Sequence, residues 1–131
     1  MIKTAIRTEK APAAIGPYSQ AVISGGLVFV SGQIPVDPAT GDVVPGGIAE
    51  QAEQALKNLQ EVLFAAGAAP DTVLKTTVFL KNMGDFGKMN EIYARFFAFS
   101  DPPARSCVEV SALPKGVLIE IDAVARVYSG E

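Results

Sequence analysis

The stretch that decides the fold covers residues 103–126 and reads PARSCVEVSALPKGVLIEIDAVAR. Its two ends, residues 103–110 and 117–126, alternate with a period of two, and this pattern predicts two β-strands. In the first strand, the alternation places Arg105 on one face of the sheet and its immediate neighbours in the chain on the other face. In the second strand, Glu120 points away from a predicted core face, which consists of Ile119, Ile121, Ala123 and Ala125.

Arg105 and Glu120 are the candidate chemical pair. A planar guanidinium binds a carboxylate through two parallel hydrogen bonds, and a glutamate among aliphatic side chains can transfer a proton, so the pair suits a small anionic substrate. Apolar neighbours should raise the pKa of Glu120 and a nearby Arg105 should lower it, so the distance between them decides the outcome. A structural ion pair is the alternative interpretation, because most such pairs serve no chemistry.

Four groups of residues carry a resemblance to a known family. They resemble, in order, the motifs of the RidA (YjgF/YER057c/UK114) family of reactive enamine/imine deaminases: IGPYSQA at residues 15–21, VSGQIP at 30–35, MNEIYARFF at 89–97, and ARSCVEV at 104–110 with the LP, G and IEI that follow it. Each motif is short, but together they cover nearly the whole chain in one order. Their joint occurrence makes the resemblance specific.

The resemblance implies a fold and an activity. The fold would be a chorismate-mutase-like subunit, and three subunits would pack their sheets into a central barrel with pockets between neighbours. The activity would be the hydrolysis of small 2-imino acids, or of enamine tautomers such as 2-aminoacrylate, to 2-oxo acids and ammonia. Arg105 would bind the substrate carboxylate, Glu120 would transfer the proton, and no cofactor would be needed.

Five further residues are candidate substrate contacts. Ser31 and Gly32 are expected where a strand ends, so a hydroxyl and a free N–H could meet a carboxylate or carbonyl; a simple strand-to-loop cap is the alternative. Tyr18 and Asn90 would otherwise be packing or helix-surface residues, and the resemblance makes both pocket candidates. Cys107 shares a face with the arginine, and the family pattern suggests a ligand contact through its backbone carbonyl. Its thiol has no histidine to activate it as a nucleophile.

The composition narrows the function classes. The 131 residues are one domain's length, and we expect a single RidA-like domain over residues 1–131. Hydrophobic residues make up 49% and charged residues 19%, so a partner subunit should cover some apolar surface. The lack of histidine removes Ser-His pairs, Cys-His pairs and imidazole metal sites, and we expect no metal. A net charge of −3 disfavours nucleic-acid binding.

Localisation follows from similar arguments. One cysteine allows no intrachain disulfide, which fits a reducing compartment. The first residues show no basic segment followed by an apolar one, and no apolar run is long enough for a membrane span. We therefore expect a cytoplasmic protein.

The rest of the chain predicts an α+β fold. Strands are expected at residues 1–7, 21–24, 27–31 and 72–80, and an amphipathic helix at residues 48–66. A second helix should start after Asp85, which can cap it, and present a core stripe of Phe86, Met89, Tyr93, Phe96 and Phe97. The order of elements predicts a single mixed β-sheet with two helices packed on one face.

Two other functions stay open at this point. A non-catalytic trimer that binds 2-oxo acids or related small carboxylates through the same Arg105 fork would carry the same motifs. Ribonuclease or translation-inhibitor activity has also been attached to this family. The acidic composition and the lack of histidine argue against that reading, because most metal-free ribonucleases need an imidazole or an equally strong base.

Overall fold

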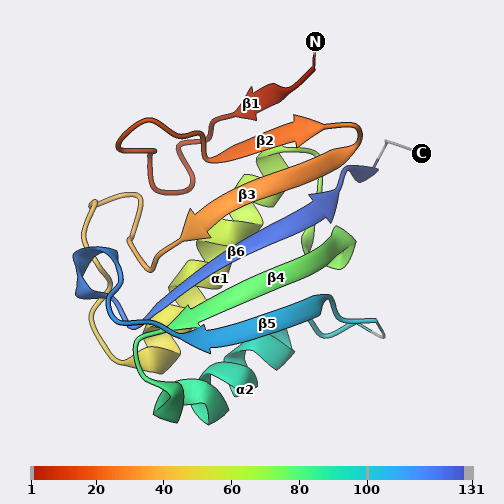
Figure 1. The fold of residues 1–131 in the computed structure, drawn as a ribbon. Helices are drawn as coiled ribbons and strands as arrows, with labels where there is room; N and C mark the ends of the chain where they lie inside the picture. Colours follow the sequence, from red (N-terminus) through yellow and green to blue (C-terminus); the bar gives the residue numbers. More distant parts are fainter. Residues whose placement is uncertain (1, 100, 129–131) are drawn as a thin grey trace.

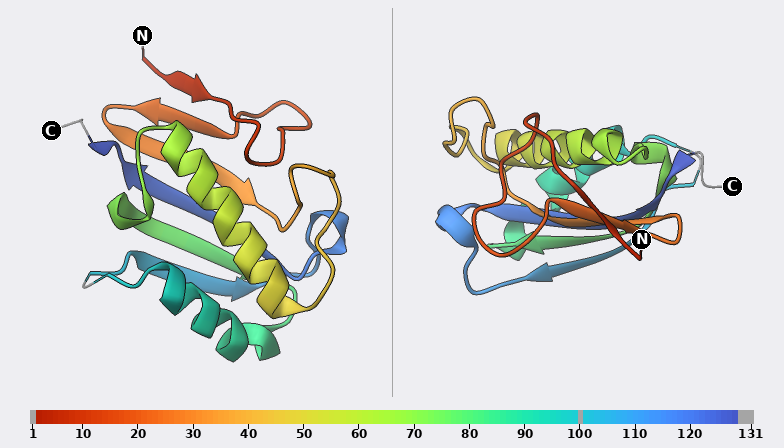
Figure 2. Two further views of the ribbon diagram at one scale, coloured as in Figure 1. Left: turned by 180° about the vertical axis from the view of Figure 1, so that it is seen from behind. Right: turned by 90° about the horizontal axis from the view of Figure 1, so that it is seen from above.

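The computed structural model describes residues 2–99 and 101–128. Its six strands are β1 Thr4–Ile6, β2 Ala21–Ser24, β3 Leu27–Gln33, β4 Val73–Leu80, β5 Ala104–Glu109 and β6 Ile119–Arg126. Its two α-helices are α1 Ile48–Ala65 and α2 Phe86–Phe96. The strands form one sheet in the order β1-β2-β3-β6-β4-β5, and both helices lie on one face of it (Figures 1 and 2). The predicted α+β class is confirmed.

The sheet is mixed because one of its neighbouring pairs is parallel. β4 and β5 run parallel and align Thr76 with Arg105, whereas every other neighbouring pair is antiparallel. β6 lies between β3 and β4, and β5 forms the edge of the sheet. The two strands of the stretch 103–126 are therefore not neighbours, because β4 separates them.

Helix α1 forms as predicted and supplies much of the core. Glu50 Oε1 accepts a 2.9 Å hydrogen bond from the backbone N–H of Gly47, which satisfies a free donor at the helix start. The helix ends before Gly67, whose φ of +78° lies in the left-handed region that glycine adopts readily. Its buried stripe faces the sheet and consists of Ala52, Ala55, Leu56, Leu59, Val62 and Leu63.

The two strands predicted at residues 21–24 and 27–31 pair with each other as a hairpin. Gly25 and Gly26 connect the strands with φ angles of +60° and +79°, and positive φ at both central residues matches a type I′ turn. β3 extends two residues further than predicted. The strand continues through Ser31 and Gly32 to Gln33, and its register against β6 shifts in this region. The two candidates therefore lie in an irregular part of a strand.

Two predictions for α2 also need correction. Asp85 occupies the position before the helix, but its side chain makes no capping hydrogen bond, because a 3₁₀ turn over Met83–Asp85 leads directly into the helix. Phe86 is 36% exposed and does not belong to the buried stripe. Met89, Tyr93 and Phe97 are buried as expected. The described part of the chain contains no helix that is long and apolar enough to cross a membrane.

The sheet has a covered face and an open face. The covered face packs on the helices and includes the predicted core residues of β6, all of which are buried. We define the open face by the residues that alternate with them and pair in register across the sheet: Phe29, Thr77, Phe79, Ser106, Val108, Glu120, Asp122 and Val124. Among the described residues, no helix lies on this face (Figure 2). Phe29 and Val108 are exposed there.

Candidate functional site

Arg105 is held in place from the covered face of the sheet. Its Nη1 donates a 2.6 Å hydrogen bond to Asn90 Oδ1 of α2. Its guanidinium carbon lies 4.7 Å from the ring centre of Tyr93 and 5.4 Å from that of Phe86, distances that permit cation–π attraction. The amide and the two rings restrict the guanidinium to one orientation, while most of its five N–H donors stay available for a ligand.

A buried hydroxyl pair supports this arrangement. The Tyr93 and Thr76 hydroxyls lie 2.7 Å apart, and this contact fixes the tyrosine ring against β4. Burial raises the pKa of Tyr93, although the Thr76 hydrogen bond and the Arg105 charge act in the opposite direction. Sequence reasoning treated Tyr93 and Phe86 only as core residues. The sequence could have indicated that the two rings lie beside Asn90, because residues 86, 90 and 93 share one helix face.

Arg105 forms no ion pair with any described carboxylate. The salt bridges among these residues are Lys88–Glu91 and Arg95–Glu53, both on the surface. Arg105 and Tyr93 instead border a cavity of about 550 Å³, which Phe97, Phe99 and Pro103 also line. A structural ion pair between Arg105 and Glu120 is therefore wrong for the subunit.

Cys107 lies on the same face as Arg105, as the alternation predicts. It is partly buried and packs against the core. Burial raises the pKa of its thiol, and the Arg105 charge offsets only part of this effect. A thiol that stays protonated is a weak nucleophile, so the side chain suits packing better than covalent chemistry.

Glu120 lies on the open face and fills a space that only glycine leaves free. A Cβ atom placed on Gly32 would lie 1.8 Å from Glu120 Oε2 and 2.7 Å from its carboxyl carbon. Burial raises the pKa of Glu120, and the neighbouring Asp122 charge raises it further. The carboxyl group therefore keeps its proton to a higher pH than an ordinary glutamate, as a group that donates a proton to a substrate requires.

The Tyr18 loop lies beside Gly32. Tyr18 is 53% exposed, and its hydroxyl accepts a 3.4 Å hydrogen bond from the Ile15 N–H. Tyr18 and Gly32 line the same cavity of about 580 Å³, and Lys115 lines it too. Ser31 Oγ donates a 2.6 Å hydrogen bond to the Ser19 carbonyl, so this hydroxyl keeps only its acceptor capacity for a ligand.

The predicted site residues therefore form two groups within the subunit. Arg105, Asn90 and Cys107 lie on the covered face near α2. The second group, near the end of β3, consists of Tyr18, Ser31, Gly32 and Glu120. The intervening strand β4 and the alternation of side chains keep the groups apart, because Arg105 aligns with buried Thr76 and Glu120 aligns with Phe79. No influence of Arg105 on the pKa of Glu120 is found.

No metal-binding constellation is found among the described residues. In residues 2–99 and 101–128, no three histidine, cysteine or carboxylate side chains come together in a way that could hold an ion.

Known proteins match this chain over nearly its whole length. The family described as Endoribonuclease L-PSP matches residues 8–127. The 2-iminobutanoate/2-iminopropanoate deaminase of Rattus norvegicus is 55% identical over 125 residues, which cover 95% of this chain and 90% of that protein. The crystal structure of YyfA from Yersinia pestis, a protein of the conserved Rid family, is 50% identical with a TM-score of 0.93, and the match covers 95% of this chain and 99% of that one.

A third relative was solved with a small molecule. The crystal structure of E. coli TdcF with bound serine is 45% identical with a TM-score of 0.90, and the match covers 94% of this chain and 98% of that chain. The fold, the sequence motifs and the matches to known proteins all indicate the same family. The chain belongs to the Endoribonuclease L-PSP family, which contains the RidA (YjgF) proteins, and the resemblance found in the sequence is confirmed.

Proposed function

We propose that this chain is a single-domain 2-imino acid deaminase that works as a homotrimer. Its substrates are small 2-imino acids and their enamine tautomers, and its products are 2-oxo acids and ammonia. The observation that carries the proposal is the guanidinium of Arg105, which Asn90 and two aromatic rings orient beside a cavity while no described carboxylate neutralises it. An oriented, unpaired guanidinium suits the bidentate binding of a substrate carboxylate.

The reaction needs one proton-transferring group near a water molecule. Water adds to the C=N carbon while the nitrogen takes up a proton, and the resulting carbinolamine passes its hydroxyl proton to the nitrogen as it collapses to the 2-oxo acid and ammonia. An enamine such as 2-aminoacrylate must first gain a proton on carbon. Glu120, whose pKa is raised by burial, donates a proton to the nitrogen and recovers one from the attacking water.

The two groups of residues suggest where the second half of each site comes from. Arg105 and Glu120 lie on opposite faces of one sheet, so one subunit does not present both to one small molecule. An exposed, partly apolar open face gives a second copy of the chain a surface to pack on. We propose sites between subunits, with Arg105, Asn90 and Cys107 from one and Tyr18, Ser31, Gly32 and Glu120 from its neighbour.

The relatives support this assignment. The rat protein named as a deaminase shares more than half of the aligned residues with this chain. The E. coli protein with bound serine indicates that the fold accepts a small amino acid, which carries the carboxylate that we assign to Arg105. A trimer that only binds 2-oxo acids is the second candidate, and it differs from the first only in turnover.

One assay tests the proposed reaction. An amino-acid oxidase generates 2-iminobutanoate in situ, and the release of 2-oxobutanoate is followed with and without this protein. We expect faster release than by spontaneous hydrolysis. Binding of 2-oxobutanoate without acceleration would favour the non-catalytic function. If the protein neither accelerates release nor binds 2-oxobutanoate, both functions are refuted.

We expect a trimer in solution. Sedimentation equilibrium should give a mass about three times the 13.7 kDa of the chain. A stable monomer at micromolar concentration would contradict both the trimer and the proposed site between subunits.

Arg105→Lys should lower kcat/KM roughly tenfold to a hundredfold. Lysine keeps the charge but loses the planar fork, and a charge-assisted hydrogen bond contributes about 1.5–3 kcal/mol. Arg95→Lys is the matched control, because Arg95 is exposed and paired with Glu53 on the surface. A normal rate per folded molecule in Arg105→Lys, with lowered thermal stability, would leave Arg105 with a structural role only.

A further inference from the structure

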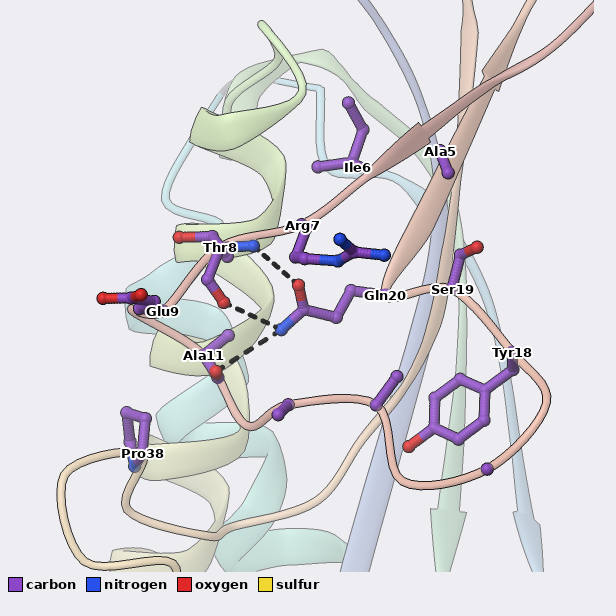
Figure 3. Close-up of a pocket in the computed structure, with 13 residues that line it drawn as sticks. Ala5, Ile6, Arg7, Thr8, Glu9, Ala11, Tyr18, Ser19, Gln20 and Pro38 are labelled. Carbon is purple, nitrogen blue, oxygen red and sulfur yellow. Dashed lines mark hydrogen bonds between the residues drawn. The ribbon is translucent and has the colours of Figure 1, made fainter.

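Gln20 stands just before β2 and is 3% exposed. Its Oε1 accepts a 2.7 Å hydrogen bond from the Thr8 N–H. Its Nε2 lies 3.1 Å from the Thr8 carbonyl oxygen, 2.8 Å from that of Pro12 and 3.4 Å from that of Ala11, and donates to these acceptors. Figure 3 shows the amide reaching across to the backbone of the loop. One buried side chain thus satisfies several backbone groups of the loop.

This amide is the polar link between the loop and the sheet. Among the described residues, every hydrogen bond that joins residues 8–14 to another part of the chain involves Gln20. The backbone of Gln20 is itself fixed, because its carbonyl accepts a 3.0 Å hydrogen bond from the Ser31 N–H on β3. Gln20 therefore connects the loop to the strand that carries Ser31 and Gly32.

Tyr18 depends on this loop for its position. Tyr18 is 53% exposed and lines two cavities, one of about 640 Å³ (Figure 3) and one of about 580 Å³. Its hydrogen bonds come from residues 15 and 16, which continue the anchored segment 8–14 along the chain: its hydroxyl accepts from the Ile15 N–H, and its own N–H donates a 2.9 Å hydrogen bond to the Gly16 carbonyl. If the loop moves, the phenol moves with it.

We infer that Gln20 is a positioning residue, which sets the place of the Tyr18 phenol in the proposed site by anchoring residues 8–12 to the sheet just before β2. This inference rests on the proposed function. Gln20 lines the cavity that Tyr18 and Gly32 share, but it is 3% exposed and the loop backbone engages its amide, so we assign it no direct contact with substrate. Its effect on the reaction passes through Tyr18, and this dependence separates a positioning role from a general contribution to stability.

The test is a double-mutant cycle between Gln20 and Tyr18. Gln20→Met keeps the length and volume of the side chain but removes all its hydrogen bonds. We expect this variant to lower kcat/KM for 2-iminobutanoate about tenfold. Tyr18→Phe should then cost several-fold in the wild-type background and less than twofold in the Gln20→Met background. Additive effects of the two changes would overturn the inference.

Native-state proteolysis measures the loop anchor without using activity. Trypsin cleaves after Lys10, which lies within the anchored segment, and we expect Gln20→Met to accelerate this cleavage at least fivefold. The control is Val62→Ala, which opens a cavity in the core under α1 and should lower thermal stability while leaving the Tyr18→Phe effect unchanged.

The two readouts separate the possible failures. Unchanged cleavage at Lys10 in Gln20→Met would overturn the anchor itself. Accelerated cleavage together with a wild-type protein that hydrolyses no 2-imino acid would refute the proposed function and, with it, any role of the anchor in positioning. A coupling of the same size in the Val62→Ala background would show a general stability effect and overturn the assignment to Gln20.

Discussion

Glu120→Gln is expected to lower kcat for 2-iminobutanoate by about 10²- to 10⁴-fold, the range that general acid–base catalysis contributes. The amide fills the same space beside Gly32 but donates and accepts no proton at useful rates. Binding of 2-oxobutanoate should stay within a fewfold of the wild type, because Arg105 is unchanged. Stopped-flow release of the 2-oxo acid and calorimetric binding measure the two effects. Full activity in this variant would move the proton transfer to water or to Tyr18.

The same variant has a second consequence, for stability. Because the folded-state pKa of Glu120 is raised, the folded protein holds this proton where the unfolded chain has already released it. Stability is then full below the unfolded-state pKa and falls as pH rises through the folded-state value. Glu120→Gln removes this loss, so its thermal midpoint should equal that of the wild type in acid and exceed it at neutral pH. A lower midpoint at neutral pH would contradict the raised pKa.

Gly32→Ala is expected to lower kcat/KM about a hundredfold, which is the cost of an ångström-scale displacement of a reacting group. The added Cβ would overlap Glu120 Oε2, so the carboxyl group must move out of its place. Gly84→Ala is the matched control, because a Cβ there meets no atom within 4 Å and the backbone φ is not positive. Progress curves for the three proteins, with circular dichroism to confirm folding, measure the effect.

The mode of action of Gly32 can be separated from a general disturbance of β3. If the methyl group acts by displacing Glu120, then Gly32→Ala should add little to the loss already caused by Glu120→Gln. A double variant with multiplied losses would mean that Gly32 contributes independently, for instance by offering its N–H to the substrate. A single Gly32→Ala variant with wild-type kinetics would contradict the steric argument altogether.

Local pattern was enough to predict most of the elements and both faces of β6. The strands at residues 21–24 and 27–31, the helix over residues 48–66 and the buried alternation from Ile119 all follow from short-range rules. The order of the strands does not, because periodicity reports which face a side chain occupies and not which strand lies beside it. β4 pairs with both β5 and β6, and this long-range pairing separates Arg105 from Glu120.

The candidate site was also predicted only in part, because periodicity does not show which segments pack against one another. The resemblance named both groups of residues, and alternation placed Cys107 with Arg105. The rings of Phe86 and Tyr93 around the guanidinium were missed, because an aromatic stripe at helical spacing is usually core. The fit between Gly32 and Glu120 and the anchor at Gln20 depend on how separate segments pack together. Such contacts leave no periodic trace in the sequence.

The placement of Arg105 and Glu120 on opposite faces of one sheet affects how the activity would depend on protein concentration. Under the proposed function, a newly synthesised subunit is inert until it meets others. Near the dissociation constant of the trimer, the rate should then rise more steeply than in proportion to the protein added. Below that concentration, most chains would be unassembled and inactive. A modest rise in expression would then assemble them into active enzyme.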